Sequence, residues 1–327
     1  MEFALSEEQA ELAATVRGLL DKRADPAAVR AASTSATGHD EALWATLCEQ
    51  IGVAALAVPE EYDGVGASFF ETAVVLEELG RSLAPSPLLA TTVATQALLA
   101  GGTEKARTRL LPRIAAGEIA TLARGEGPVL DGDRAAIVLA VRGEDLVEVT
   151  GASATWVPSM DQSIRLARLD LADAGVAVVG DGAAAAARAE LVTAASAAAL
   201  AVGLADRALR MTVAYTQERV QFGRPIGSFQ ALKHRMAEVF ARTELARAAS
   251  WAASYTLAEG GEDADFLTRA AVAAALEAAQ LAAAECVQMH GGIAITWEHD
   301  AHLVLKRAHA LAGLAGAAHV HRAAVAL

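Results

Sequence analysis

The sequence predicts a mainly α-helical protein with a small β-domain in the middle of the chain. Aromatic residues make up only 4% of the 327 residues, and Ala, Leu, Glu and Arg are abundant. This composition favours helices, because strands prefer β-branched and aromatic residues. The pattern changes between residues 118 and 182, where glycines punctuate short apolar runs. We therefore expect a helical domain over residues 1–117, a β-domain over 118–182 and a four-helix domain over 183–327.

Helix signals follow one another through the first domain. Ser6, with Gln9 three residues later, opens an amphipathic stretch that continues to Leu20. A second helix is expected over 40–50, and the turn-rich segment PEEYDGVG then breaks the chain. A third helix is expected over 68–81. Two more helices follow, separated by Gly101 and Gly102.

Short strands and then long helices account for the rest of the chain. The runs 135–141 and 146–149 are apolar or β-prone, which indicates strands. The alanines from residue 183 begin a helix, and four long helices are expected up to Leu327. Glycines near 223–227, 260–261 and 291–292 mark the breaks between them.

The overall charge excludes some classes of partner. A net charge of −13 and a pI near 5.1 disfavour nucleic acids and anionic membrane surfaces, which require clustered Lys and Arg. Much of the 54% hydrophobic content is Ala, and the most apolar stretch, 191–205, predicts a buried helix and no membrane span. The first residues lack a basic segment followed by an apolar core, so we expect a cytoplasmic protein.

Metal and nucleophile motifs are missing from the sequence. Cys48 and Cys286 lie far apart without ligand spacing, and we expect both to be buried small hydrophobes. His290, His299 and His302 form no recognisable ligand set, so no metal site is predicted. The sequence also contains no GxSxG elbow, Walker A or GxGxxG loop.

Two helix junctions remain as candidate phosphate sites. In the segment ERVQFGRPIGSFQALKHRMAEVF, Arg219 could pair with a phosphate and Gln230 could bond an adenine or a carbonyl. The alternative is a structural corner in which Arg219 caps a helix and Phe222 fills the core. In QMHGGIAITWEHD, Gly291 and Gly292 permit backbone N–H groups to approach a pyrophosphate, or form only a turn.

Three separated segments, in order, resemble the acyl-CoA dehydrogenase family. They are LWATLCEQIGVAALAVPEEYDGVGASFFETAVVLEELGRSL, RVQFGRPIGSFQALKHRMAE and QMHGGIAITWEHD. The resemblance implies the acyl-CoA dehydrogenase fold: an N-terminal helical domain, a middle β-domain and a C-terminal four-helix bundle. It also implies FAD at a subunit interface, α,β-desaturation of an acyl-CoA, and electron transfer to an electron-transfer flavoprotein.

The resemblance assigns candidate FAD contacts to individual positions. Arg219 is similar to the family's arginine at the FAD diphosphate, and Phe222 and Gln230 fall on neighbouring flavin-contact positions. Gln288, Gly291 and Gly292 fall on the turn that touches the adenosine and diphosphate. In the family, these groups serve the FAD held mainly by the adjacent subunit.

The catalytic base of the family has no counterpart at its usual position. That position falls at about Ala315, and the sequence contains no Asp or Glu from residue 301 to residue 327. The alternative position falls near Thr193. Glu190, one helical turn away, is then either a displaced base or a helix-start acid favoured by the helix dipole.

The middle domain also departs from the family. ATLARGEGPVLDGD stands where the family carries a Thr-Glu-Pro-type loop along the flavin. In SATWVPS, Trp156 corresponds by resemblance to the family's Trp-Ile-Thr strand, but Pro158 replaces the Thr. Losing the base and the flavin cradle while keeping the contacts to a neighbour's FAD resembles the short, non-catalytic subunit of actinobacterial heteromeric enzymes. These assemble as α2β2 with a full-length partner and degrade steroid side chains. The small residues 194–202 either line a wide pocket or allow close helix packing.

Two other hypotheses stay open. A self-sufficient homo-oligomeric dehydrogenase would use Glu190 or another displaced acid as its base. A non-enzymatic scaffold is the third reading, because a fold does not fix a function.

Overall fold

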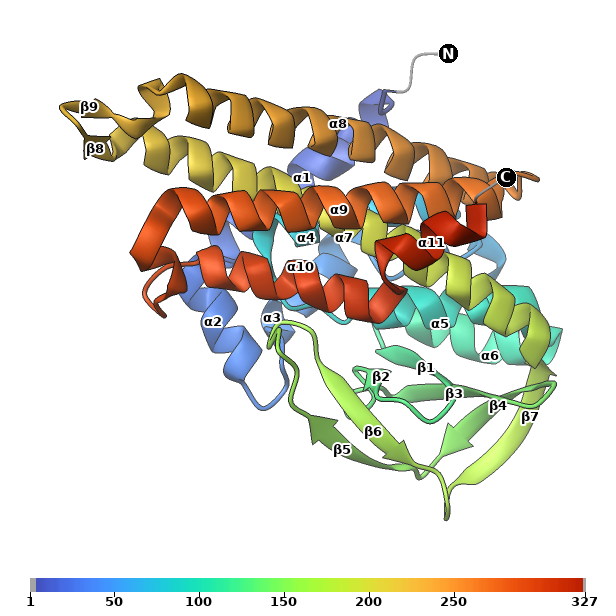
Figure 1. Ribbon diagram of the computed structural model, residues 1–327. Coiled ribbons are helices and arrows are strands. Elements are labelled where there is room, and N and C mark those ends of the chain that lie inside the picture. Colours follow the sequence, from blue (N-terminus) through green and yellow to red (C-terminus); the bar gives the residue numbers. More distant parts are fainter. Residues whose placement is uncertain (1–3, 326–327) are drawn as a thin grey trace.

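The computed structural model describes residues 4–325, and its N-terminal part is helical (Figure 1). Ser6 caps the first helix with both halves of a capping box, as its sequence predicts. Helix α2 was not predicted from the sequence, although Asp25 caps it and Pro26 occupies its first turn. The helices are α1 (Glu7–Arg23), α2 (Pro26–Thr34), α3 (Glu41–Thr46), α4 (Phe69–Ser82), α5 (Leu88–Gly101) and α6 (Glu104–Ala115).

The middle of the chain forms two small sheets. Strands β1, β3, β4 and β7 form one sheet in that order, with β1 parallel to β3 and the other pairs antiparallel. Strands β2, β6 and β5 form the other. The predicted strands are confirmed as β3 and β4. The bounds are β1 (Ala120–Arg124), β2 (Val129–Leu130), β3 (Ile137–Arg142), β4 (Asp145–Thr150), β5 (Ser153–Val157), β6 (Leu166–Asp170) and β7 (Gly175–Asp181).

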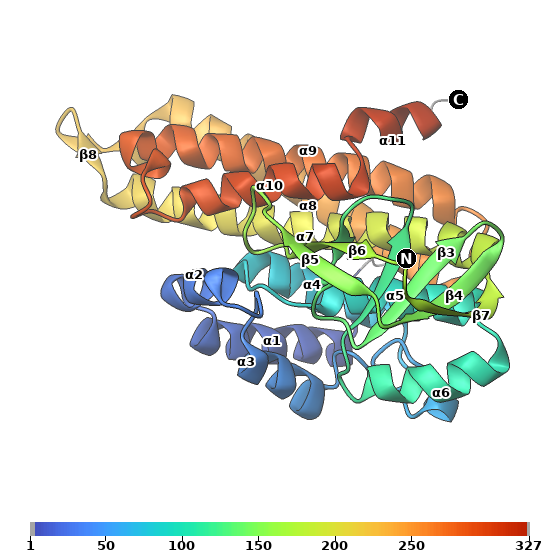
Figure 2. The same ribbon diagram turned by 90° about the horizontal axis from the view of Figure 1, so that it is seen from below.

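Long helices form the C-terminal part and lie above the sheets (Figures 1 and 2). They are α7 (Gly182–Glu218), α8 (Gln230–Glu259), α9 (Ala264–His290), α10 (Ala301–Ala315) and α11 (Ala318–Val325). The three glycine breaks fall where the sequence predicts them. The expectation of one last helix to Leu327 was wrong, because Gly316 adopts a φ of +94° and separates α10 from α11. Residues 326–327 lie outside the described residues.

Helix α7 is the central element, and its small residues serve close packing. A Cβ at Gly203 would lie 1.9 Å from the Glu77 carbonyl oxygen of α4, and a Cβ at Gly80 would lie 2.2 Å from the Leu200 carbonyl oxygen. Residues 194–202 are all buried. Within 191–202, Thr193 lines a cavity of about 470 Å³ and Leu200 lines a small one of about 30 Å³. The buried small residues of 194–202 therefore serve close helix packing and form no wide pocket. Two helices, α7 and the one over 264–295, are long and apolar enough to cross a membrane. Their most apolar windows are 83% and 56% buried in this fold, as core helices are.

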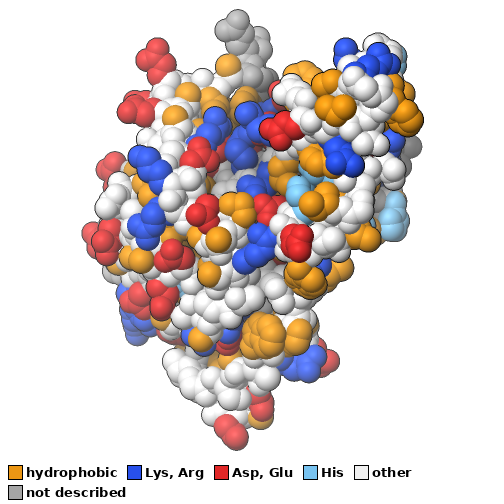
Figure 3. Space-filling view, turned by 90° about the vertical axis from the view of Figure 1, so that its left-hand side faces the viewer, with side chains coloured by type: hydrophobic (Ala, Val, Ile, Leu, Met, Phe, Trp, Pro, Cys, Tyr) orange, Lys and Arg blue, Asp and Glu red, His pale blue; other side chains and the backbone are white. Residues whose placement is uncertain are grey.

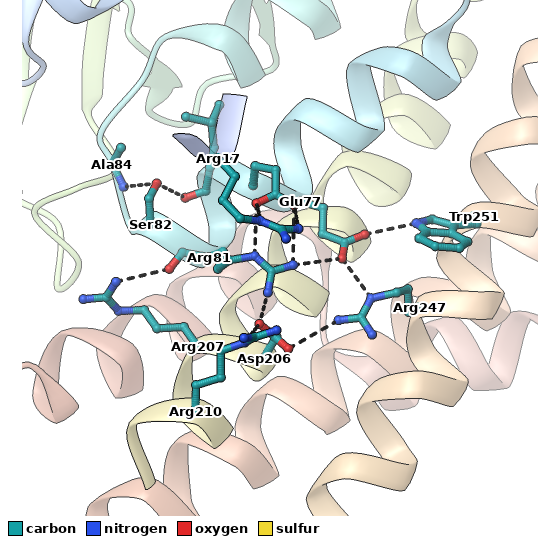
Figure 4. Close-up of polar contacts among 12 residues, drawn as sticks. Arg17, Glu77, Arg81, Ser82, Ala84, Asp206, Arg207, Arg210, Arg247 and Trp251 are labelled. Atoms are coloured by element: carbon teal, nitrogen blue, oxygen red, sulfur yellow. Dashed lines mark hydrogen bonds and ion pairs between the residues drawn. The ribbon is translucent and has the colours of Figure 1, made fainter. Parts of the chain in front are cut away.

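A buried network of charged side chains joins α1, α4, α7 and α8 (Figure 4). Glu77 of α4 accepts from Arg247 Nε at 2.9 Å and from Trp251 Nε1 at 3.0 Å, both on α8. Arg81 of α4 pairs with Asp206 of α7. Because these groups are largely shielded from water, each depends on its partners for compensation. The network thereby fixes the N-terminal helices against the C-terminal bundle.

Candidate functional site

A short hairpin projects from the end of α7 and carries the first candidate segment. Strand β8 (Val220–Gln221) pairs antiparallel with β9 (Arg224–Pro225). The two residues between them, Phe222 and Gly223, have φ values of +52° and +76°, as two-residue hairpin turns of type I′ require. Phe222 is 91% exposed. The alternative in which Phe222 fills the core was therefore wrong.

The hairpin is braced against the start of α8. The Phe222 and Phe229 rings meet edge to face with centroids 6.1 Å apart. The Arg224 guanidinium carbon lies 4.1 Å from the centroid of the Phe229 ring. Gln230 is the first residue of α8 and its side chain bonds His234 Nε2 at 2.7 Å. Arg219 occupies the C-cap position of α7 through its backbone N–H, which donates to the Tyr215 carbonyl.

The second candidate segment meets the first at the same end of the bundle, on the left of Figure 1. The Tyr215 ring near the end of α7 stacks on the His290 ring at the end of α9, with centroids 4.3 Å apart. Burial lowers the pKa of His290, and its Nδ1 lies 2.7 Å from the Cys286 carbonyl oxygen. A neutral ring at pH 7 therefore holds the two segments together. Gln288 is exposed, and Gly291, with a φ of +65°, begins the turn.

The charge and the space at this end, the hairpin corner, suit an anionic cofactor tail. Residues 219–237, between Glu218 and Glu238, contain four Lys or Arg. One of them, Arg235, pairs with Glu285 of α9 at 2.7 Å, which leaves Arg219, Arg224 and Lys233 as the cations of the corner. A Cβ at Gly291 or at Gly292 would meet no atom within 4 Å, so the backbone there is open to approach. Figure 3 looks onto this end and shows hydrophobic and basic side chains gathered at its upper right. A diphosphate fits such a surface by its charge and by access to backbone N–H groups.

A separate cavity of about 470 Å³ lies between the β-domain and the helices. Its walls come from α5, β1, the loop after β1, β2, the segment 159–164, β6, α7 and α10. Thr193 of α7 and Arg124 of β1 line it, and its lining residues include no Asp or Glu. None of the six candidate FAD contacts lines this cavity. The chain thus holds its two candidate sites apart.

The candidate base does not reach this cavity. Glu190 lies on α7, where Arg269 Nη2 of α9 donates to its Oε1 at 3.1 Å, and its side chain is 56% exposed. Ala315 is the last residue of α10 and offers only a methyl group. The base position predicted from the resemblance therefore carries no proton acceptor.

Sequence reasoning missed Arg124. The segment ATLARGEGPVLDGD was recognised as a departure from the family, but spacing alone gave no signal that its arginine lines a cavity. Burial lowers the pKa of Arg124, and the charge of Glu190 opposes that shift. The cavity wall therefore includes the cationic side chain of Arg124 and no carboxylate that could act as a base.

A helical N-terminal part, two small sheets and a C-terminal bundle of long helices form the arrangement that the resemblance predicts for an acyl-CoA dehydrogenase. Comparison by sequence agrees. Residues 6–118 match the N-terminal domain of acyl-CoA dehydrogenases and residues 180–327 match their C-terminal domain. The chain belongs to the acyl-CoA dehydrogenase family.

Individual proteins are similar to this chain over nearly its whole length. The chain is 47% identical to acyl-CoA dehydrogenase IpdE2 of Mycobacterium tuberculosis, over 94% of this chain and 93% of that protein. It is 45% identical to IpdE2 of Mycolicibacterium smegmatis, over 95% and 96% of the two chains. A solved variant of the Tcur3481–Tcur3483 steroid ACAD superposes with a TM-score of 0.87 at 28% identity, covering 98% of this chain and 96% of that one. The ChsE4–ChsE5 complex of M. tuberculosis gives 0.87 at 25% identity, with 99% and 98% covered.

Proposed function

We propose that this chain is the short subunit of a heteromeric, FAD-dependent acyl-CoA dehydrogenase. It lends contacts for the FAD tail, while a full-length partner subunit supplies the catalytic glutamate. One observation carries the proposal: the candidate FAD-contact residues are all exposed at one corner, away from a cavity of this chain whose lining residues include no carboxylate. Exposed contacts that lie away from the chain's own cavity suit a cofactor that a neighbouring subunit holds. An α2β2 assembly follows as the expected form.

The chemistry divides between the two chains. Bound FAD would supply the acceptor for the β-carbon hydride of the acyl thioester and the route for electrons to an electron-transfer flavoprotein. Removal of the weakly acidic α-proton needs a carboxylate, which Ala315 does not provide. Arg219 would pair with the diphosphate, and the backbone around Gly291 and Gly292 would approach the same group. Phe222 would cover the flavin end with an apolar ring.

The proposed substrate is an acyl-CoA with a steroid-derived acyl group. One of the similar solved structures supports this class, because it is described as a steroid ACAD. The other, described as the ChsE4–ChsE5 complex, supports the heteromeric assembly and says nothing of the substrate. The partner's cavity would hold the acyl group, because this chain's cavity lacks the base.

Flavin absorbance of the purified protein tests the proposal. The full chain is prepared alone and co-expressed with a full-length acyl-CoA dehydrogenase encoded beside it. We expect visible flavin colour only in the co-purified complex. A stoichiometrically yellow chain that an acyl-CoA bleaches without a partner would overturn the shared site and favour the self-sufficient enzyme. A colourless complex in which the activity of the partner subunit is unchanged would favour the non-enzymatic scaffold.

A matched pair of variants locates the contact within the complex. Arg219→Gln should weaken FAD binding about tenfold to a hundredfold, because one charge-assisted hydrogen bond to a phosphate is lost. Arg142→Gln, at the exposed end of β3, removes the same charge elsewhere and should leave the FAD affinity unchanged. Equal effects of the two variants would refute the assignment of Arg219.

A further inference from the structure

The cavity of about 470 Å³ has a chemistry that the proposed function leaves unused. Most of its wall is aliphatic, contributed by α5, β1, the loop after β1 and α10. Its only charged lining residue is Arg124 at the end of β1. Neither Glu126, in the same loop, nor Glu190 belongs to the wall. A cavity of this size is in the range that encloses small organic ligands.

The polar groups of the wall differ in whether they are already engaged. The Thr121 hydroxyl donates to the Leu130 carbonyl at 2.6 Å, and the Thr193 hydroxyl donates to the Ala189 carbonyl at 2.6 Å. Across residues 4–325, by contrast, the side chains of Arg124 and Ser159 form no hydrogen bond or ion pair. Glu190, whose charge acts on Arg124, is itself bonded to Arg269. Arg124 is an exposed residue that lines the cavity, and no protein group within the described residues occupies its donors.

These observations point to a particular class of ligand. We infer that the cavity binds an apolar molecule with a single free carboxylate, which Arg124 holds by charge-assisted hydrogen bonds while Ser159 donates a further one. A planar guanidinium matches a carboxylate in two parallel bonds. A coenzyme A thioester is disfavoured here, because its diphosphate and 3′-phosphate would need several cations and the wall offers one. The ligand proposed for this chain is therefore a free carboxylic acid that binds without reacting.

The site is far from the hairpin corner. Thr193 and Arg219 are 26 residues apart along α7, which corresponds to about 39 Å at 1.5 Å per residue. The cavity can therefore be occupied while the hairpin corner contacts FAD. This separation also makes the two proposals independently testable.

Binding of decanoate and of decanamide, measured by calorimetry on the full chain alone and in the co-expressed complex, tests the inference. The two probes have the same alkyl chain and differ in charge. We expect decanoate to bind about tenfold to a hundredfold more tightly than decanamide. Arg124→Gln should abolish this difference. Equal affinity of the two probes for the native chain, or an unchanged preference in Arg124→Gln, would overturn the inference.

A second pair of variants tests the location. Gly313 of α10 lines the cavity, and a Cβ there would meet no atom within 4 Å. Gly313→Leu should therefore fill the cavity without a clash and abolish binding of both probes. Gly18→Leu on α1, where a Cβ also meets nothing within 4 Å, should leave binding unchanged. Unaltered binding in Gly313→Leu would place the ligand elsewhere and refute the site.

The cofactor content separates this inference from the proposed function. Neither Arg124→Gln nor Gly313→Leu should change the FAD content of the complex, whereas Arg219→Gln should lower it. If decanoate displaced FAD, or if the cavity variants alone removed the flavin, the cavity would be a flavin site and the inference would fail. Failure of the complex to form would count against the proposed function only.

Discussion

Replacing Asp131 with Asn should stabilise the protein, and increasingly so as the pH rises. Asp131 follows β2, is 6% exposed and has a φ of +49°. Its backbone N–H donates to the Arg165 carbonyl, but its carboxylate forms no hydrogen bond or ion pair within residues 4–325. Arg165 instead donates to Asp133 at 3.0 Å. Burial raises the pKa of Asp131 to about 7, the charge of Asp133 adds to this, and Arg165 opposes it.

The size of the effect follows from linkage between protonation and folding. The unfolded chain releases this proton near pH 3.8 and the folded chain near pH 7. Between these values the folded state binds more protons, so its free energy of unfolding decreases as the pH rises. A separation of about three pH units at 1.36 kcal/mol per unit amounts to about 4 kcal/mol over the whole window. Between pH 5 and pH 8 the loss is about 2.5 kcal/mol.

Urea melts at pH 5 and pH 8 test this calculation. The stability advantage of Asp131→Asn over the native chain should grow by about 2.5 kcal/mol between the two pH values. Asn tolerates a left-handed backbone conformation as Asp does, so the substitution adds no strain. Asp173→Asn, at an exposed turn, is the control and should show no such growth. The same advantage at both pH values would refute the reasoning.

Two further predictions concern the contacts that join α4 to the bundle. Glu77→Gln should cost about 2–4 kcal/mol, because the buried Arg247 loses its charged acceptor. Glu244→Gln removes a half-exposed acid from the same arginine and should cost less than about 1 kcal/mol; equal losses in urea melts would contradict the role of burial. Gly203→Val should destabilise by about 3 kcal/mol, since its Cβ would overlap the Glu77 carbonyl, and a thermal melt that matches the native chain would refute this close approach.

Local signals in the sequence located most of the helices. The capping box at Ser6 and the breaks at Gly223, Gly260 and Gly291 each act through residues within one or two helical turns, so they are visible in the sequence. The missed break at Gly316 shows the limit. An isolated glycine in an alanine-rich run gives no further local sign that the chain will turn.

The assignment of the cavity wall could not be made locally. Arg124, Thr193 and Gly313 come from β1, α7 and α10, and the spacing between them in sequence carries no information about their approach. The alanines of 194–202 gave a similar ambiguity, because a small side chain suits both a pocket wall and a close helix contact. The close contact between α4 and α7 shows that these small side chains serve helix packing.

The sequence by itself determined the family and the lack of any Asp or Glu in residues 301–327, because motifs and missing acids are properties of residue identity. It also determined the helix ends that caps and glycines define. Only the tertiary structure decided that Phe222 is exposed and that the Tyr215–His290 stack brings two distant segments to one corner. It also decided that Arg124 faces an apolar cavity without an acid on its wall. Exposure and proximity depend on which remote elements pack together, and that packing is settled by the whole chain.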